Sequence, residues 1–167
     1  VVSDTGSAVV LDADNGLGPV TAPKSMKLCI ERAKEYGVAV VVSRHANNYG
    51  MSGYYPLMAV EEGLIGVTTT YSSPLVAPFG GKEKLFGTNP IAIGVPAGEQ
   101  YPIVLDMATT VVAGGKLTVA VQKGEKIPFG WAVDKDGKPT DDPDILSKGG
   151  ALLPMGGPKG YGLMVMA

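Results

Sequence analysis

The stretch at residues 40–55, VVVSRHANNYGMSGYY, constrains the fold of this chain more than any other segment. Three consecutive valines, Val40 to Val42, are typical of a short strand that is covered on both faces. The six residues that follow, from Ser43 to Asn48, are mostly polar or small. Loops at the ends of strands carry much of the chemistry of α/β proteins. The stretch therefore predicts a buried strand that ends in a functional loop.

Apolar spacing and turn-forming residues predict the other elements of an α/β chain. These are a strand at 8–11, a helix capped by Thr21 and ended by Gly37, a strand at 38–43, a helix at 52–62 bent near Pro56, a strand at 64–70, a hairpin of strands at 91–95 and 102–105, a helix at 109–121, turns over 124–150 and an apolar helix from Leu163. The elements between residues 38 and 70 form a β-α-β succession.

The size and charge of the chain limit the classes of partner. At 167 residues it is long enough for a hydrophobic core, and we predict a single cofactor-binding domain over residues 1–167. A net charge of −2 without runs of like charge argues against binding to nucleic acid or to an anionic membrane. No signal peptide or membrane span is visible, so a cytoplasmic location is expected. The expected partner is a small molecule or another subunit.

Cysteine and acidic residues do not predict a metal site. Cys29 is the single cysteine, which excludes an intrachain disulfide and argues against a cysteine-based zinc site. Acidic residues gather between Asp134 and Asp144, but the spacing of a calcium-binding EF-hand is missing. We predict turns in this segment and no metal.

Residues 71–90 form a long segment rich in proline, glycine and short polar side chains. Ser72, Ser73 and Asn89 offer hydroxyl and amide groups that suit the ribose, phosphate or carboxamide of a cofactor. Taken alone, the same residues are explained more simply as turn residues that satisfy the backbone.

Five blocks of sequence resemble the malate/L-lactate dehydrogenase-like family of NAD(P)-dependent oxidoreductases, which includes ureidoglycolate, sulfolactate and cyclic imino acid enzymes. The blocks occur in the order of the family and are NYGMSGYY (48–55), SSPLVAPFGG (72–81), GTNP (87–90), VLDMATT (104–110) and ALLPMGGPKGYG (151–162). The resemblance implies a non-Rossmann NAD(P)-binding fold, with a mixed sheet and flanking helices. It also implies a homodimer that transfers hydride between the nicotinamide of NAD or NADP and a small 2-hydroxy or 2-oxo acid such as malate or lactate.

The same resemblance implies which residues contact the cofactor. They are Ser72, Ser73, Asn89, Asp106, Met107, Ala108, Thr109, Lys159 and Gly160. For the segment from Asp106 the physical reason is a strand that gives way to a helix, where free backbone N–H groups bind polar groups of a nucleotide. An aspartate followed by threonines is also an ordinary helix start. For Lys159 the reason is one cation among glycines, which suits an anion.

The proton partner of the hydride transfer departs from the family pattern. The family has a histidine where this chain has Asn48, and a neutral amide cannot exchange a proton near pH 7. The single histidine, His45, lies three residues earlier. Three accounts remain open, namely a protein that has lost the chemistry, a shifted loop that brings His45 into the site, and a misassigned stretch of sequence.

Two further expectations follow from the resemblance. Both ends of the family's sequence are expected to be missing, including the arginine and serine that bind substrate, and neither Arg32 nor Arg44 matches that arginine's motif. The five blocks make a malate/lactate-type dehydrogenase the first hypothesis. The alternative, which rests on Asn48, is a catalytically impaired relative that binds cofactor. A generic α/β interaction domain would explain the composition but not five ordered blocks.

Overall fold

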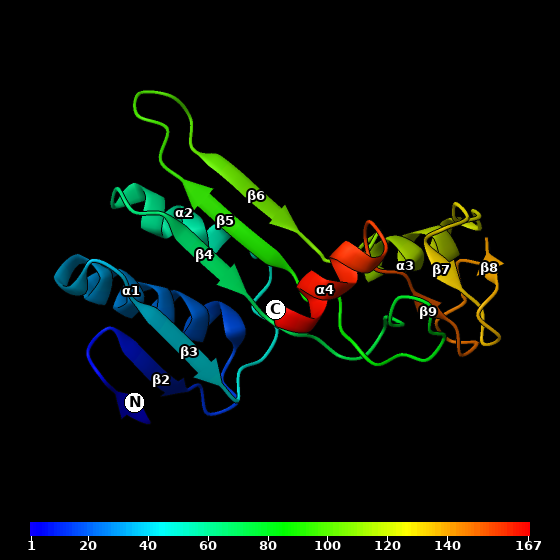
Figure 1. Ribbon diagram of the computed structural model, residues 1–167, viewed down its shortest axis with the longest axis horizontal. Helices are drawn as coiled ribbons and strands as arrows, with labels where there is room; N and C mark the ends of the chain where they lie inside the picture. The colour runs from blue at the N-terminus through cyan, green and yellow to red at the C-terminus, as the bar shows by residue number, and fades with distance from the viewer. The chain divides into compact units, whose positions relative to one another are not determined.

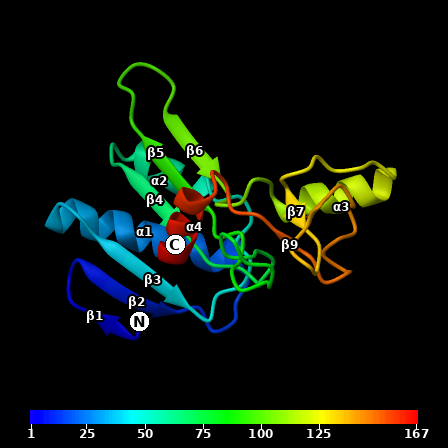
Figure 2. The same ribbon diagram turned by 45° about the vertical axis from the view of Figure 1, so that its right-hand side comes forward.

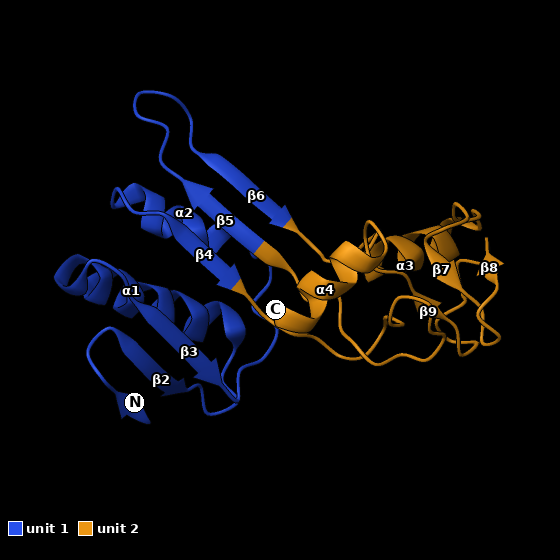
Figure 3. Cartoon of the chain, viewed as in Figure 1, with its two compact units in different colours: residues 1–68, 92–106 blue, residues 69–91, 107–167 orange.

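The computed structural model describes residues 1–167, which divide into two compact units (Figure 3). Unit 1 comprises residues 1–68 and 92–106, and unit 2 comprises residues 69–91 and 107–167. The assignment of the whole chain to a single cofactor-binding domain stays a prediction. None of the helices has the length and apolar character needed to cross a membrane.

Unit 1 begins with a three-stranded mixed sheet and one long helix (Figures 1 and 2). The strands are β1 (Ser3–Asp4), β2 (Ala8–Asp12) and β3 (Val40–Arg44), in the order β1-β2-β3, and the helix is α1 (Gly18–Tyr36). Strands β1 and β2 are antiparallel, whereas β2 and β3 are parallel, with Ala8 opposite Val40 and Asp12 opposite Arg44. Because β2 and β3 are parallel and in register, their carboxyl ends lie side by side.

Helix α1 starts earlier than the sequence predicts. Leu17 precedes it with an extended backbone, and Pro19 occupies the first turn, where its missing N–H is not needed. Thr21 is therefore inside the helix, and the prediction that it caps the helix was wrong. The end is as predicted, because Gly37 adopts a φ of 84° and its N–H bonds to the carbonyl of Ala33.

Strand β3 is covered on one face only, so the prediction of a strand buried on both faces was wrong. Val40 and Val42 are 56% and 54% exposed. Val41 and Ser43 point to the other face and are partly buried, and Ser43 bonds to Ser25 of α1. A single helix can cover one face of a sheet, and side chains along a strand alternate between faces. The run of valines reports β propensity here and not two-sided burial.

The remaining elements of unit 1 are a short helix and most of a second sheet. Helix α2 (Tyr54–Glu61) runs without interruption, because Pro56 lies in its first turn. The strands are β4 (Gly66–Thr69), β5 (Ile91–Val95) and β6 (Ile103–Met107), in the order β4-β5-β6. The predicted hairpin is confirmed, since β5 and β6 are neighbours joined by a loop (Figure 1). However, β3 and β4 belong to different sheets, so the β-α-β succession does not form one sheet.

Unit 2 is built around a small antiparallel sheet and two helices. The elements are α3 (Gly114–Lys123), β7 (Ala132–Val133), β8 (Pro139–Thr140), β9 (Ala151–Leu152) and α4 (Pro158–Met166), with the strand order β8-β7-β9. Leu117, Leu152 and Met164 are at most 2% exposed and form the centre of its core.

Both helices of unit 2 begin at places that the sequence analysis did not predict. Helix α3 starts at Gly114 and not at Thr109, so the glycine pair at 114–115 lies in its first turn. Helix α4 starts at Pro158, five residues before the predicted start at Leu163. In each case the start coincides with glycine or proline, which tolerate the first turn of a helix well.

Candidate functional site

The loop after β3 brings the single histidine against an aspartate of the neighbouring strand. His45 Nδ1 lies 3.1 Å from one carboxylate oxygen of Asp12 and 3.2 Å from the other. Arg44 donates from Nε to the same carboxylate at 3.0 Å. The parallel register of β2 and β3 creates this group, because it places Asp12 directly opposite Arg44. The sequence analysis did not predict the contact between Asp12 and His45.

The Asp12 carboxylate is held in its charged form. Hydrogen bonds lower its pKa from 3.8 to about 2, first from the backbone N–H of Asp14 and then from the His45 side chain. A carboxylate that stays ionised can only accept hydrogen bonds. The Nδ1 hydrogen of His45 therefore faces the carboxylate, and in the neutral tautomer of that geometry Nε2 is the acceptor. The imidazole is 59% exposed, so that nitrogen can reach a bound molecule.

We expect the Asp12 carboxylate to titrate with a midpoint near pH 2. Its folded-state pKa lies below the ordinary 3.8, so its stabilising contribution is present above pH 3.8 and is lost as the pH falls towards 2. NMR titration of the side-chain carbonyl carbon measures this midpoint. In the His45→Ala variant the midpoint should move up, because one donor is lost. A midpoint of 3.8 in the unsubstituted protein would show that the hydrogen bonds are absent in solution.

Asn48, at the position of the family's histidine, is used within its own loop. Its Oδ1 accepts the backbone N–H of Gly50 at 2.8 Å. Gly50 has a φ of 80°, which favours glycine. The side chain of Asn48 is exposed and its amide holds no exchangeable acid or base near neutrality. Asn48 can therefore orient a polar group but cannot take or give a proton.

The loop from His45 to Gly53 is fixed by close contacts on both sides. A side chain at Gly18 would meet the Asn48 carbonyl group and would come within 2.6 Å of Tyr49 Cα. The rings of Tyr49 and Tyr55 stack with centroids 4.9 Å apart, and the Tyr55 hydroxyl donates to the Tyr49 carbonyl. The loop therefore has little freedom to slide, and Gly18 sets the distance between the loop and α1.

Asp106 serves the same loop. Its Oδ2 accepts the backbone N–H of Gly53 at 2.7 Å. The physical reason given above for a cofactor contact, free N–H groups at a helix start, was wrong, because β6 continues to Met107 and the next helix begins at Gly114. A carboxylate bonded to a backbone N–H at this distance is a structural contact in its own right.

In unit 2, Thr109 is fully buried and committed to the protein. Its N–H and its hydroxyl both donate to the carbonyl of Thr88, at 2.9 and 3.1 Å. Met107 and Ala108 are partly buried beside it. These contacts leave the side chain of Thr109 no free donor for a cofactor.

Asn89 and Ser72 hold the 71–90 segment together. Asn89 is 5% exposed, with a φ of 29°, and its amide joins the Ser72 N–H at 3.2 Å to the Met164 carbonyl at 2.9 Å. Ser72 Oγ accepts the N–H of Thr88 at 3.0 Å. Ser73 is exposed, and no hydrogen bond of its hydroxyl to the rest of the protein is observed. Of the three residues, Ser73 is the one whose side chain is free to bind a ligand.

Lys159 and Gly160 lie in the first turn of α4. Lys159 is exposed and makes no ion pair or hydrogen bond through its ammonium group. Gly157, at the helix cap, has a φ of 62°. A side chain at Gly160 would overlap the Met155 carbonyl oxygen and come within 2.7 Å of Met155 Cγ. Lys159 therefore offers a free cation, while Gly160 permits the close packing beneath it.

The predicted site residues fall into two groups. His45, Asn48 and Asp106 belong to unit 1, where Asn48 lies on the fixed loop and Asp106, on β6, accepts a hydrogen bond from Gly53 of that loop. The other predicted residues, from Ser72 to Gly160, belong to unit 2. No three His, Cys, Asp or Glu side chains of residues 1–167 come together as a metal site would require.

These features define an α/β protein in which a carboxylate orients a histidine at the ends of the strands. The family model described as malate/L-lactate dehydrogenase matches residues 1–167. The chain is 52% identical over 163 residues to the L-sulfolactate dehydrogenase of Methanocaldococcus jannaschii, covering 98% of this chain and 47% of that protein. It is 49% identical over 173 residues to the malate dehydrogenase of Pyrococcus horikoshii, covering 99% and 48%.

Solved structures give the same result. The sulfolactate dehydrogenase from Methanocaldococcus jannaschii superposes with a TM-score of 0.90 at 51% identity, over 99% of this chain and 48% of that one. The malate dehydrogenase from Entamoeba histolytica gives a TM-score of 0.93 at 37% identity, over 99% and 49%. The chain belongs to the malate/L-lactate dehydrogenase family and has its mixed α/β fold, as predicted. It spans about half the length of the curated relatives it matches.

Proposed function

We propose that the protein is an NAD(P)-dependent oxidoreductase that interconverts a small 2-hydroxy acid and the corresponding 2-oxo acid. The observation that carries this proposal is the match along the whole chain to relatives named dehydrogenases, two of them at about half identity. One further relative, from Escherichia coli, is named ureidoglycolate dehydrogenase (NAD(+)), so we propose NAD as the first cofactor to test and NADP as the second. Malate, sulfolactate and lactate are the first substrates to test.

We assign the proton transfer to His45. Oxidation of a 2-hydroxy acid releases a hydroxyl proton, and the free Nε2 of His45 accepts it while Asp12 holds the ring from the opposite nitrogen. In the reverse direction the protonated imidazole returns the proton to the substrate oxygen. The nicotinamide, when bound, accepts or gives the hydride. Asn48 and Asp106 act on this loop by fixing its shape.

We assign the contact with the anionic part of the cofactor to Lys159 and Ser73. The donors of unit 2 fit such a group, because Lys159 is an unpaired exposed cation beside glycine backbone and Ser73 has a free hydroxyl. Gly160 belongs to this set through the packing that it allows. The side chains of Ser72, Asn89 and Thr109 are used in hydrogen bonds within unit 2. Asp106, Met107 and Ala108 remain candidates for contact through their backbone.

The test is an assay of the natural full-length protein with NADH or NADPH and a panel of 2-oxo acids. We expect oxidation of the reduced cofactor with at least one acid of the panel, followed as the loss of its absorbance. Binding of NADH without turnover on any acid would contradict the proposal. Gel filtration of the same sample tests the predicted homodimer, and cell fractionation tests the predicted cytoplasmic location.

A second candidate function is a catalytically impaired relative that binds cofactor. The observation that favours it is Asn48. Its side-chain oxygen accepts the backbone N–H of Gly50, and its amide cannot exchange a proton near neutral pH. In that case the unsubstituted protein binds NADH without turnover, and Asn48→His gains measurable turnover. If Asn48→His leaves an active enzyme unchanged, the proton transfer does not depend on position 48.

A further inference from the structure

Strands β3 and β4 each lie at an open edge of their sheets. β3 is the last strand in the order β1-β2-β3, and β4 is the first in the order β4-β5-β6. Figures 1 and 2 show β3 as the strand of its sheet nearest to β4, and in Figure 1 both strands point in the same direction. Because they belong to different sheets, no ladder of backbone hydrogen bonds joins them. An edge strand presents a row of unpaired N–H and C=O groups, so both edges are templates for a further strand.

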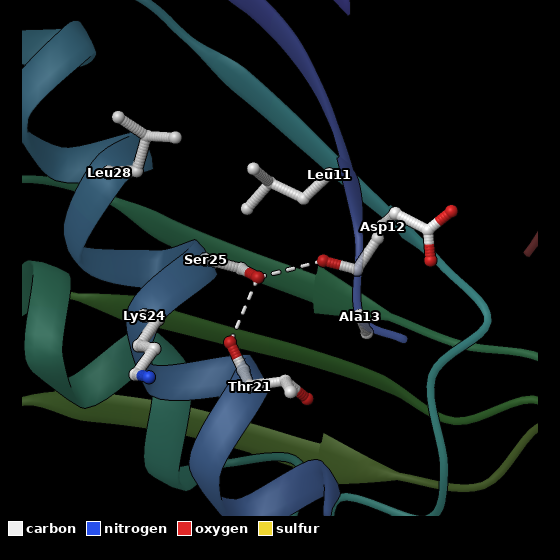
Figure 4. Close-up of a pocket in the computed structure, with 8 residues that line it drawn as sticks. Leu11, Asp12, Ala13, Thr21, Lys24, Ser25 and Leu28 are labelled. Atoms are coloured by element: carbon white, nitrogen blue, oxygen red, sulfur yellow. Dashed lines mark hydrogen bonds between the residues drawn. The ribbon is translucent and has the colours of Figure 1, made fainter. Parts of the chain in front are cut away.

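Each of these two edge strands lies under a helix of its own. Ser25 of α1 bonds to Ser43 of β3 at 2.7 Å, whereas a hollow of about 370 Å³ remains between α1 and Leu11 of β2 (Figure 4). Helix α1 therefore packs more closely on β3 than on β2. In the second sheet, a side chain at Gly66 of β4 would come within 2.7 Å of Pro56, so α2 packs directly on β4.

The contact between the two helices sets the interval between β3 and β4. Helices α1 and α2 pack against each other, and Lys34 of α1 pairs with Glu62, directly after α2, at 2.6 Å. Packed helices lie about 8–10 Å apart, whereas neighbouring strands of a sheet lie about 4.8 Å apart. Since one helix rests on β3 and the other on β4, the helices hold these strands roughly two strand spacings apart. That interval fits one further strand.

The register of β3 identifies the backbone groups at its open edge. Val40 donates its N–H to the carbonyl of Ser7 at 2.8 Å, and β2 and β3 are paired in parallel. Successive residues of a strand direct their backbone groups to opposite sides, so Val42 also bonds to β2. The N–H and C=O groups of Val41 and Ser43 therefore point to the open edge.

The apolar side chains beside both edges are uncovered on the face away from the helices. Val42 of β3 is 54% exposed and Val67 of β4 is 57% exposed. Their neighbours Ser43 and Gly66 face the helices, as the alternation of side chains along a strand requires. A strand between β3 and β4 would have helices on one face and these valines beside it on the other. Strands covered on both faces are apolar throughout.

We propose that a strand from the part of the full-length protein outside residues 1–167 lies between β3 and β4 and joins the two sheets into one. The chain spans about half the length of the curated relatives it matches, so a segment of similar length is available to supply this strand. The strand is a run of apolar residues, and its backbone bonds to Val41 and Ser43. It thereby fixes β3, the strand that carries His45 at its end.

The first test is amide hydrogen exchange of the full-length protein, followed by NMR. We expect the amides of Val41 and Ser43 to exchange within about tenfold of the rate of Val42, because all three N–H groups are then bonded in one sheet. Val42 is the internal reference, since its N–H bonds to β2 whether or not a further strand is present. Exchange of Ser43 more than about tenfold faster than that of Val42 overturns the proposal.

The second test identifies the source of the strand. The full-length Val67→p-benzoylphenylalanine variant is irradiated, and the cross-linked product is separated on a denaturing gel and mapped by mass spectrometry. We expect a product of monomer size that joins residue 67 to a peptide outside residues 1–167. The same substitution at Tyr101, which is 95% exposed in the loop between β5 and β6, is the control and should not give that product. A product of dimer size, which assigns the strand to a second copy, or cross-links confined to residues 1–167 overturn the proposal.

Discussion

Replacing His45 by alanine is expected to lower kcat by about 10²- to 10⁴-fold, the usual contribution of a positioned general acid or base. His45 is the single histidine of the chain, and its ring is held against Asp12 through Nδ1. The assay is cofactor oxidation by the full-length protein, compared at several pH values.

A second variant separates proton transfer from backbone strain. His45 has a φ of 52°, a conformation that costs alanine more than asparagine. His45→Asn keeps a polar side chain within reach of Asp12 and tolerates this φ, but it cannot titrate. Both variants should show the same loss of kcat, with His45→Asn the more stable of the two. Full activity of a folded His45→Asn protein would remove His45 from the mechanism.

The site shows why the sequence alone could not settle this question. Asp12 and His45 are 33 residues apart, and they meet only because β2 and β3 are parallel with Asp12 opposite Arg44. Periodicity predicts that both strands exist but does not give their register. Sequence analysis therefore offered Asn48 or His45 as alternatives. The pairing of the strands gives His45 a carboxylate partner and leaves Asn48 within its own turn.

Element ends were predicted well where a residue has one strong backbone preference, and poorly elsewhere. Gly37 ends α1 as expected because its positive φ suits glycine. Thr21 and Thr109 were expected at helix starts, since threonine favours that position. In the folded chain the nearby Pro19 and Gly114 lie in those first turns, and Thr109 is buried by its bonds to Thr88. Tertiary packing decided these positions against local preference.

The burial of β3 was mispredicted for a similar reason. Val40 and Val42 are as apolar as a two-sided buried strand requires, yet they are more than half exposed. The sequence records which side chains favour a strand, but the number of layers that cover it depends on other segments. In contrast, the family resemblance gave the overall fold correctly, because five ordered blocks constrain the whole chain at once.

Substitution of Gly160 by alanine is expected to destabilise the protein by about 3 kcal/mol, near the upper end for an overpacked core position. A Cβ at this position would overlap the Met155 carbonyl oxygen, which is backbone and cannot rotate away. Gly160 is itself buried in the first turn of α4. Met164, further along the same helix, is 1% exposed. Either α4 must move away from residue 155, or the turn before it must change.

Gly162→Ala is the matched control, because it makes the same chemical change two residues later in the same helix. An added Cβ at Gly162 meets no atom within 4 Å, so alanine there should stabilise the protein by about 0.5–1 kcal/mol through its higher helix propensity. Urea unfolding of the full-length variants without cofactor measures both changes. Opposite signs would establish that Gly160 is required for packing. If Gly160→Ala unfolds like Gly162→Ala and only weakens NADH binding, Gly160 acts through the cofactor and not through Met155.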